Sequence, residues 1–200
     1  LDICPKGAIT IEDSIKAYNA IIDKTRCVNC NLCHNVCAVN NPPEKSMPQE
    51  WYQGWVGEPQ RTKSSSGGFA SAISSKFIKN GGIVCSCEFK DGQFIFGFAE
   101  KEEELDRFVG SKYVKSNPTG THKTIQEYLN SGKNVLFIGL PCQVAGLKNY
   151  IRTNSDKLYT IDLICHGSPS PQLLESFLSD YKVSIKHIKS ISFRKKNNFR

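Results

Sequence analysis

The sequence has no long apolar segment. Its longest strongly apolar run, Val135 to Leu140, is far short of the roughly 18 residues that a membrane-spanning helix needs. No secretory signal is visible, and the chain begins at Leu1 rather than at a methionine. We therefore expect a cytoplasmic protein without a membrane span, whose true start lies upstream. No acid–base triad or phosphate-transfer motif is present, which argues against the common hydrolase and kinase chemistries.

Acidic residues are outnumbered, since 19 Asp and Glu face 26 Lys and Arg and leave a net charge of +7. The basic residues are scattered except for a C-terminal cluster of Arg194, Lys195, Lys196 and Arg200. Such a cluster can bind nucleic acid, but no aromatic platform or DNA-binding motif accompanies it. We predict no nucleic-acid partner, and we interpret the cluster as a solvated face or a site for an acidic coenzyme.

Cysteine, in contrast, is abundant, with nine residues in the chain. Four of them, Cys27, Cys30, Cys33 and Cys37, follow the C-x2-C-x2-C-x3-C spacing of bacterial ferredoxins, which wraps a 4Fe-4S cluster. Zinc is the alternative, but zinc sites usually pair two Cys-x2-Cys knuckles across a longer gap. The tight run favours an iron–sulfur cluster in a reducing compartment over a secreted disulfide framework.

Cys4 and Pro5, followed by the apolar Ile9 and Ile11, resemble the end of a first ferredoxin run. The other cysteines of that run would lie before residue 1. In two-cluster ferredoxins the last cysteine of each run ligates the other cluster. The cross-ligation predicts one cluster on Cys4, Cys27, Cys30 and Cys33. Cys37 then belongs to a second cluster whose remaining ligands lie outside this chain.

The middle of the chain changes character twice. Residues 44–62 read as an irregular linker, in which Trp51, Tyr52 and Trp55 either pack onto neighbouring segments or stack on a ring cofactor.

A serine- and glycine-rich stretch, residues 64–68, then precedes a helix that shows Phe69, Ala72, Ile73 and Phe77 on one face. Such a helix start leaves N–H groups that can hold phosphate. A hairpin over residues 83–98, with a turn at Asp91-Gly92, is expected next.

A strand, a cysteine loop and a helix then occur twice in succession. Residues 135–138 and 159–164 are the strands, and Cys142 and Cys165 are in the loops that follow them. This order favours parallel strands, and ligands of parallel sheets bind beyond the carboxyl ends of the strands. The spacing alone leaves open whether the two cysteines share one chemistry.

Four stretches together carry a resemblance to a known family: SSSGGFASAI (64–73), GSKYVKS (110–116), LPCQVAGLKNY (140–150) and DLICHGSPSP (162–171). They resemble the β-subunit family of coenzyme F420 hydrogenase and dehydrogenase, whose members carry FAD and iron–sulfur clusters. The resemblance runs over residues 61–200. It implies a flavin domain over residues 63–200 that continues beyond the chain, behind a ferredoxin module (1–43) and the linker.

The resemblance also implies site residues. For FAD these are Ser66, Gly67, Gly68, Gly110, Ser111, Lys112, Tyr113, Ser116 and Gln143. It further implies that Cys142 and Cys165 ligate another cluster, although no Cys-x2-Cys pair follows to complete it. His166 would lie beside that cluster and the flavin, as a proton donor or a structural residue. Lys112 and His166 are the candidate catalytic groups.

We therefore expect an α+β ferredoxin-like module followed by an α/β flavin domain with a mixed, partly parallel sheet. The predicted function is an iron–sulfur flavoprotein oxidoreductase. It would pass electrons between a small hydride donor or acceptor at FAD, such as coenzyme F420, and 4Fe-4S clusters that serve a redox partner protein or ferredoxin. The alternative is a non-catalytic electron-transfer protein that carries clusters alone.

Overall fold

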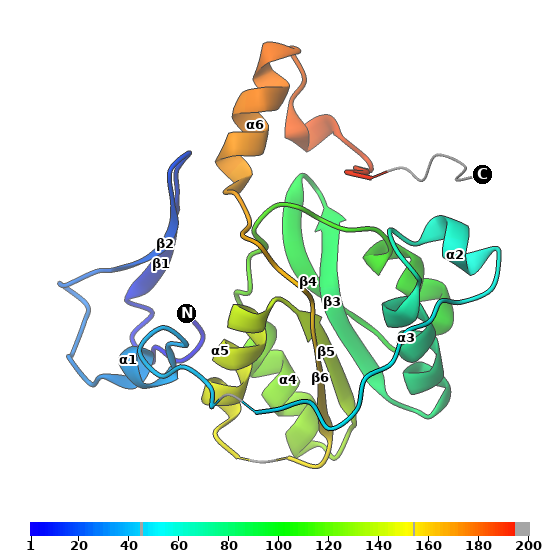
Figure 1. The fold of residues 1–200 in the computed structure, drawn as a ribbon. Coiled ribbons are helices and arrows are strands. Elements are labelled where there is room, and N and C mark those ends of the chain that lie inside the picture. The colour runs from blue at the N-terminus through cyan, green and yellow to red at the C-terminus, as the bar shows by residue number, and fades with distance from the viewer. Residues whose placement is uncertain (45, 154, 195–200) are drawn as a thin grey trace.

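A four-stranded sheet is the central element of the computed structural model, which describes residues 1–44, 46–153 and 155–194. The strands lie in the order β4-β3-β5-β6, with β3 antiparallel to β4 and parallel to β5, and β5 parallel to β6 (Figure 1). The predicted mixed, partly parallel sheet is thereby confirmed. The strands are β3 (Ile83–Lys90), β4 (Gln93–Ala99), β5 (Val135–Gly139) and β6 (Leu158–Asp162).

Helices cover both faces of this sheet (Figure 1). One face is packed against α4 and α5, and the other against α3 and the 3₁₀ helix η1. The three layers explain why β5 is apolar at every position, because a strand covered on both faces has no side that meets water. The covering elements are α3 (Phe69–Lys79), η1 (Glu102–Phe108), α4 (Thr121–Asn130) and α5 (Pro141–Ile151).

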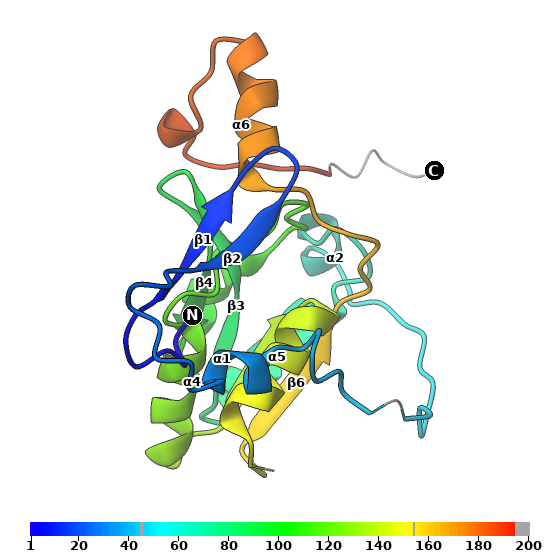
Figure 2. The same cartoon turned by 90° about the vertical axis from the view of Figure 1, so that its left-hand side faces the viewer.

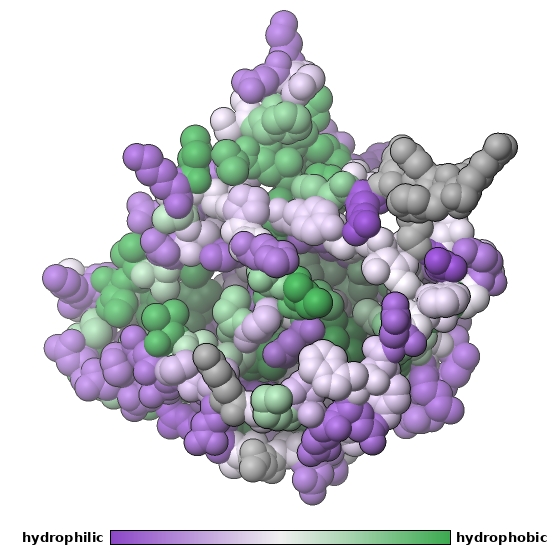
Figure 3. Space-filling view, viewed as in Figure 1, coloured by the Kyte–Doolittle hydropathy of each residue, from purple (hydrophilic) through white to green (hydrophobic). Residues whose placement is uncertain are grey.

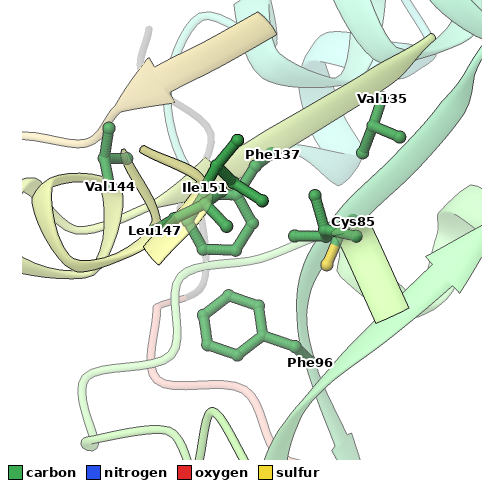
Figure 4. Packing of buried hydrophobic residues seen from close by; sticks show 8 residues of the cluster. Cys85, Phe96, Val135, Phe137, Val144, Leu147 and Ile151 are labelled. Atoms are coloured by element: carbon green, nitrogen blue, oxygen red, sulfur yellow. The ribbon is translucent and has the colours of Figure 1, made fainter. Parts of the chain in front are cut away.

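Alternation along the strands divides the core into two clusters. Cys85, Phe96 and Phe137 face α4 and α5, and the rings of the two phenylalanines lie 5.1 Å apart between centroids (Figure 4). Val84 and Leu136, the neighbouring residues on the same strands, face α3 and η1 instead. This follows from the two-residue period of a strand. Cys85 is completely buried and is therefore part of the core.

Beyond the tip of the β3–β4 hairpin, helix α6 (Pro171–Asp180) and the short η2 (Ile185–His187) project from the sheet (Figure 1). Ser170 caps α6 by accepting a hydrogen bond from the backbone N–H of Leu173 at 3.3 Å, and a proline follows the cap. Leu174 and Leu178 pack toward Phe94 and Ile185. The space-filling view shows hydrophobic surface over α6 (Figure 3).

The N-terminal region is a separate small unit beside α5 (Figure 2). It consists of an antiparallel hairpin and a one-turn helix, and hydrogen bonds connect it to the sheet domain at two places. The side chain of Asn149 donates to the carbonyl of Asn41 at 2.8 Å, and the Asp2 carboxylate accepts from the N–H of Gly120 at 2.8 Å. The elements are β1 (Ile9–Asp13), β2 (Tyr18–Ile22) and α1 (Leu32–Val36).

The described part of the linker is irregular apart from the short helix α2 (Gln60–Lys63). The expectation that its aromatic residues pack onto neighbouring segments is wrong for Trp51 and Tyr52, whose side chains are 85% and 80% exposed. Within the described ranges, no helix combines the length and the apolarity that crossing a membrane requires. Of the basic C-terminal cluster, Arg194 is described, whereas Lys195, Lys196 and Arg200 lie outside the described residues.

Candidate functional site

The β1–β2 hairpin brings two cysteine loops together. Ile9 pairs with Ile22 at the open end of the hairpin, so Cys4 lies five residues before this pair and Cys27 five residues after it. The Arg26 guanidinium donates to the carbonyl of Lys6 at 2.8 Å, which ties one loop to the other. This register is what the predicted joint ligation by Cys4 and Cys27 requires.

Backbone N–H groups already point at two of these sulfurs. The Sγ of Cys4 accepts from the N–H of Ala8 at 3.3 Å, and the Sγ of Cys27 accepts from that of Asn29 at 3.5 Å. The hydrogen bond from Ala8 is the main cause that lowers the pKa of the Cys4 thiol, since a donor favours the charged form. Asn29 and Asn31 hold left-handed φ values of 53° and 58°, a loop conformation that turns N–H groups toward an anion.

These features fit a thiolate-bound cluster, because N–H···S hydrogen bonds are a recurrent means of tuning iron–sulfur sites. The described part of the chain nevertheless contains no preassembled group of three or more His, Cys, Asp or Glu side chains able to hold a metal ion. All nine cysteines are unpaired thiols. The ligand sets assigned to Cys30, Cys33 and Cys37, as well as to Cys4 and Cys27, therefore remain predictions.

The two cysteines that follow β5 and β6 also occupy equivalent positions. Cys142 was predicted to lie in a loop, but it belongs to the first turn of α5, whereas Cys165 does lie in a loop. Gly139 pairs with Asp162 at the carboxyl ends of β5 and β6, and Cys142 and Cys165 each follow this pair by three residues. Both cysteines are exposed, and the Sγ of Cys165 accepts from the N–H of Gly167 at 3.3 Å. The prediction that parallel strands deliver both cysteines to one sheet edge is confirmed. Their ligation of a cluster remains a prediction.

A cavity of about 370 Å³ opens at the same edge of the sheet. Its floor includes Ser86 of β3 and Ile138 of β5, and Leu163, two residues before Cys165, contributes to its wall. We call it the serine–glycine cavity, because residues 64–68 and the start of α3 form one side and residues 108–111 form the other. It combines apolar side chains with several hydroxyl groups, as small-molecule sites commonly do.

The start of α3 is shaped by close backbone contacts. Gly68 has φ of 83° and a side chain there would approach Val56 Cγ2 to 2.4 Å, so only glycine fits. The N–H of Val56 donates to the carbonyl of Gly67 at 2.8 Å, which lays the linker segment 54–56 along the helix start. No side chain caps α3. Its first-turn N–H groups are therefore suited to an anionic ligand group.

Five of the predicted cofactor residues line this cavity: Ser66, Gly67, Gly68, Gly110 and Ser111. The two sequence stretches that contain them are joined by a hydrogen bond, in which the N–H of Ser111 donates to Ser65 Oγ at 2.7 Å. Segments 46 residues apart thus form the two walls of one cavity.

The other four predicted cofactor residues are not among those that line the cavity. The Lys112 ammonium donates to the carbonyls of Arg107, Phe108 and Val109 at 3.3, 2.7 and 3.1 Å. Its three donors are thus directed at the carboxyl end of η1. Burial lowers the pKa of Lys112. Tyr113 is half exposed and packs edge-on against Phe193.

Ser116 and Gln143 bond to each other, with the Gln143 side-chain amide donating to Ser116 Oγ at 2.9 Å. The same glutamine accepts from the N–H of Leu140 at 2.9 Å. This pair joins the loop of residues 110–116 to the start of α5, where Cys142 lies. In the structure the two residues hold loops in place, and any contact with a cofactor remains a prediction.

A buried carboxylate supports the wall behind the cavity. Glu88 is 6% exposed and lies 3.6 Å from the guanidinium of Arg107. Cys87, beside it on β3, has its pKa raised by burial, which favours the neutral thiol. His166, the other candidate catalytic residue, is exposed in the loop after Cys165.

Sequence reasoning missed several lining residues, among them Ser86, Leu105, Ile138 and Leu163. Ser86 and Ile138 are opposite one another in the β3–β5 register, so a correct strand alignment would have placed them together. Leu163 was assigned to a strand predicted over residues 159–164, whereas β6 ends at Asp162. It therefore directly follows the strand, which is the position where parallel sheets bind ligands. Leu105 offers no such signal, because it stands in a charged run.

Comparison with known proteins agrees with the resemblance seen in the sequence. Residues 132–200 match the family model that describes the C terminus of the coenzyme F420 hydrogenase/dehydrogenase beta subunit. This stretch contains β5, α5, β6 and α6. The predicted similarity to that family is thereby confirmed.

The fold is similar to that of a chain in the F420-reducing NiFe hydrogenase complex from Methanosarcina barkeri, with a TM-score of 0.54 and 20% sequence identity. The superposition covers 71% of this chain and 53% of that chain, so the present chain spans about half of that chain's length. No curated protein matches the chain.

Proposed function

We propose that this chain is part of an iron–sulfur flavoprotein oxidoreductase. In this proposal FAD binds in the serine–glycine cavity, and 4Fe-4S clusters bind the cysteines of residues 1–43. The observation that carries the proposal is the shared sheet edge. The cavity, Cys142 at the start of α5 and the Cys165 loop lie at the carboxyl ends of the same parallel strands, and Leu163 belongs both to the cavity wall and to the Cys165 loop.

The residues of the cavity suit a dinucleotide. First-turn N–H groups of α3 and the neighbouring hydroxyls favour a pyrophosphate, while Ile138, Phe108 and Leu163 offer apolar surface to a ring. When bound, FAD would exchange a hydride with a substrate and single electrons with the clusters. The protein's part is to fix the ring beside the cysteine loops and to limit its contact with water.

The neighbouring solved chain belongs to an F420-reducing hydrogenase complex, which supports a small hydride donor or acceptor such as coenzyme F420 as the substrate. It also supports a partner protein or ferredoxin that exchanges electrons with the clusters. In this proposal His166, which is exposed in the loop after Cys165, serves as the proton donor or acceptor. Lys112 contributes a positive charge behind the cavity wall, held there by three carbonyls.

The first experiment is anaerobic purification followed by visible spectroscopy with iron, zinc and flavin analysis. Iron with bound FAD is expected. Clusters without flavin would favour the alternative of a non-catalytic electron-transfer protein, and zinc with neither group would contradict the assignment of the cysteine run.

A matched pair of glycine substitutions locates the flavin. At Gly67 an added Cβ would lie 2.9 Å from the carbonyl oxygen of Gly54, whereas at Gly57 it would meet nothing within 4 Å. Gly67→Ala should therefore displace the linker from the start of α3 and weaken FAD binding about tenfold or more. Gly57→Ala should leave binding unchanged. Equal FAD affinities in the two variants would place the flavin elsewhere.

A further inference from the structure

A second cavity, of about 420 Å³, lies on the outer face of α3. Trp55 and Val56 of the linker form one wall, and Phe69, Ile73 and Phe77 of α3 form the other. We call it the tryptophan cavity. The helix face predicted from the spacing of its apolar residues therefore lines this cavity, and Phe69 and Ile73 remain 49% and 39% exposed. The residues of α3 buried in the core are Ser74 and Ile78.

The two cavities are neighbours. Gly54 and Phe69 line both of them, and a side chain at Gly54 would come within 3.3 Å of the Phe69 ring. The start of α3, at Gly67 and Gly68, lies between them. A molecule whose charged centre sits at this helix start can therefore extend one end into each cavity.

The tryptophan cavity has the chemistry of a nucleoside site. Trp55 presents a large aromatic surface, and the Arg61 guanidinium lies 5.3 Å from the centre of its ring, which makes the rim positive. Lys76 and Asn80 also line the cavity. The Asn80 amide offers a donor and an acceptor side by side, the pattern that pairs with the edge of adenine. Aromatic side chains bind such bases by stacking.

We infer that the tryptophan cavity binds the adenosine half of the dinucleotide whose flavin half occupies the serine–glycine cavity. This inference rests on the proposed function. It adds to that proposal a separate binding cavity for each half of the dinucleotide. The redox-active ring belongs next to the cysteine loops, and among the two sets of lining residues Leu163 belongs to the serine–glycine cavity alone. The remaining ring, which takes no part in electron transfer, fits the cavity farther from the cysteines.

The linker then has a specific role. Gly54 lines both cavities, Trp55 and Val56 line the tryptophan cavity, and the hydrogen bond from the N–H of Val56 to the carbonyl of Gly67 holds this segment in place. Trp55 selects a dinucleotide over a mononucleotide, because FMN lacks the ring that would stack on it.

The test compares FAD with FMN, using the anaerobically prepared full chain stripped of its flavin and titrated by flavin fluorescence. The wild type should bind FAD at least about tenfold more tightly than FMN, since stacking of one base contributes an effect of this order. Trp55→Ala should reduce FAD affinity about tenfold and leave FMN affinity within about twofold. Trp51→Ala is the matched control, because Trp51 stands in the same linker, is 85% exposed and does not line the cavity.

The failures are distinguishable. If wild-type protein binds neither flavin, the proposed function fails and the inference fails with it. If it binds FMN and FAD equally well, or if Trp55→Ala weakens both alike, the flavin site stands and the adenosine site is overturned. Trp55→Phe guards against misfolding of the alanine variant, since a smaller ring should retain most of the preference for FAD. Asn80→Ala gives an independent check and should also weaken FAD alone.

Discussion

Residues 1–43 and the sheet domain are built on different principles. Within residues 1–43, Ala8 is the one buried residue, and Ile21, Ile22 and Val28 are all about half exposed. The sheet domain, in contrast, buries Phe137 and many other apolar side chains completely. A region with so small a core does not gain enough from the hydrophobic effect to offset the ordering of its chain. We therefore expect the N-terminal region to need its metal for stability, whereas the sheet domain does not.

Removal of iron gives the largest expected effect. Because a metal-bound small domain gains its folding free energy from metal binding, chelation should unfold residues 1–43 while the sheet stays folded. Hydrogen exchange measured by mass spectrometry should show loss of protection in β1 and β2 and unchanged protection in β5. Retained protection of the β1–β2 hairpin without iron would show that contacts other than metal ligation stabilise the region.

The converse change is Phe137→Ala in the sheet. This ring is fully buried between Phe96 and the α5 side chains, so its removal should lower the free energy of unfolding of the sheet domain by about 3–5 kcal/mol. Urea denaturation followed by circular dichroism measures the loss. Iron content per chain should not change. Phe177→Ala is the control, because that ring is 56% exposed on α6 and should cost less than about 0.5 kcal/mol.

The same contrast explains what the sequence could predict. The sheet domain is governed by local patterns, so the hairpin turn at Asp91-Gly92, the start of α3 and the parallel β5 and β6 could all be predicted. Asp91 and Gly92 have φ values of 50° and 76°, as the predicted turn requires. In residues 1–43 the cysteine spacing predicted ligands but little else, because a metal site does not require a hydrophobic periodicity.

Side-chain directions could not be predicted from the motifs. The stretch 110–116 was identified as a unit, yet Gly110 and Ser111 line the cavity while Lys112 reaches back to η1 and Ser116 meets Gln143. A motif match assigns residues to a region and leaves their rotamers open. The linker was harder still, since nothing in an irregular, aromatic segment indicates that residues 54–56 lie along the start of α3.

A smaller effect concerns the boundary between the two regions. Burial lowers the pKa of His122, on α4, to about 4, with Asp2 opposing this shift. The folded state therefore prefers the neutral imidazole, and the unfolded chain takes up its proton near pH 6.5. The stabilisation that depends on the neutral imidazole should be fully present above about pH 6.5 and should decline as the pH falls toward 4. At pH 5 the free energy of unfolding should be lower by about 2 kcal/mol.

His122→Leu isolates this contribution, because the variant carries the same cysteines and differs from the wild type in one titrating group. Urea midpoints at about pH 7.5 and about pH 5, on either side of the unfolded-state pKa, should differ less in the variant than in the wild type. An identical pH dependence in both proteins would show that folding does not lower the pKa of His122.

The smallest expected effect tests whether the two regions communicate. Helix α4 begins after Gly120 with no side-chain cap from its own segment. The Asp2 carboxylate supplies the cap from 118 residues away, accepting from the N–H of Gly120 at 2.8 Å and from that of Lys123 at 3.4 Å. Asp2→Ala should therefore destabilise α4 by about 1 kcal/mol, seen as faster exchange of its first-turn amides. Asp23→Ala is the control, since that carboxylate bonds within its own turn, to Thr25.

The decisive experiment repeats Asp2→Ala after iron removal. If the cluster holds residues 1–8 in place, the cap exists only in the iron-loaded protein, and the substitution should then have no effect on α4. The difference between the two measurements is the coupling free energy of cluster and helix. An undiminished effect in the iron-free protein would mean that Asp2 docks on α4 without the metal, and the two regions would then be less independent than their cores indicate.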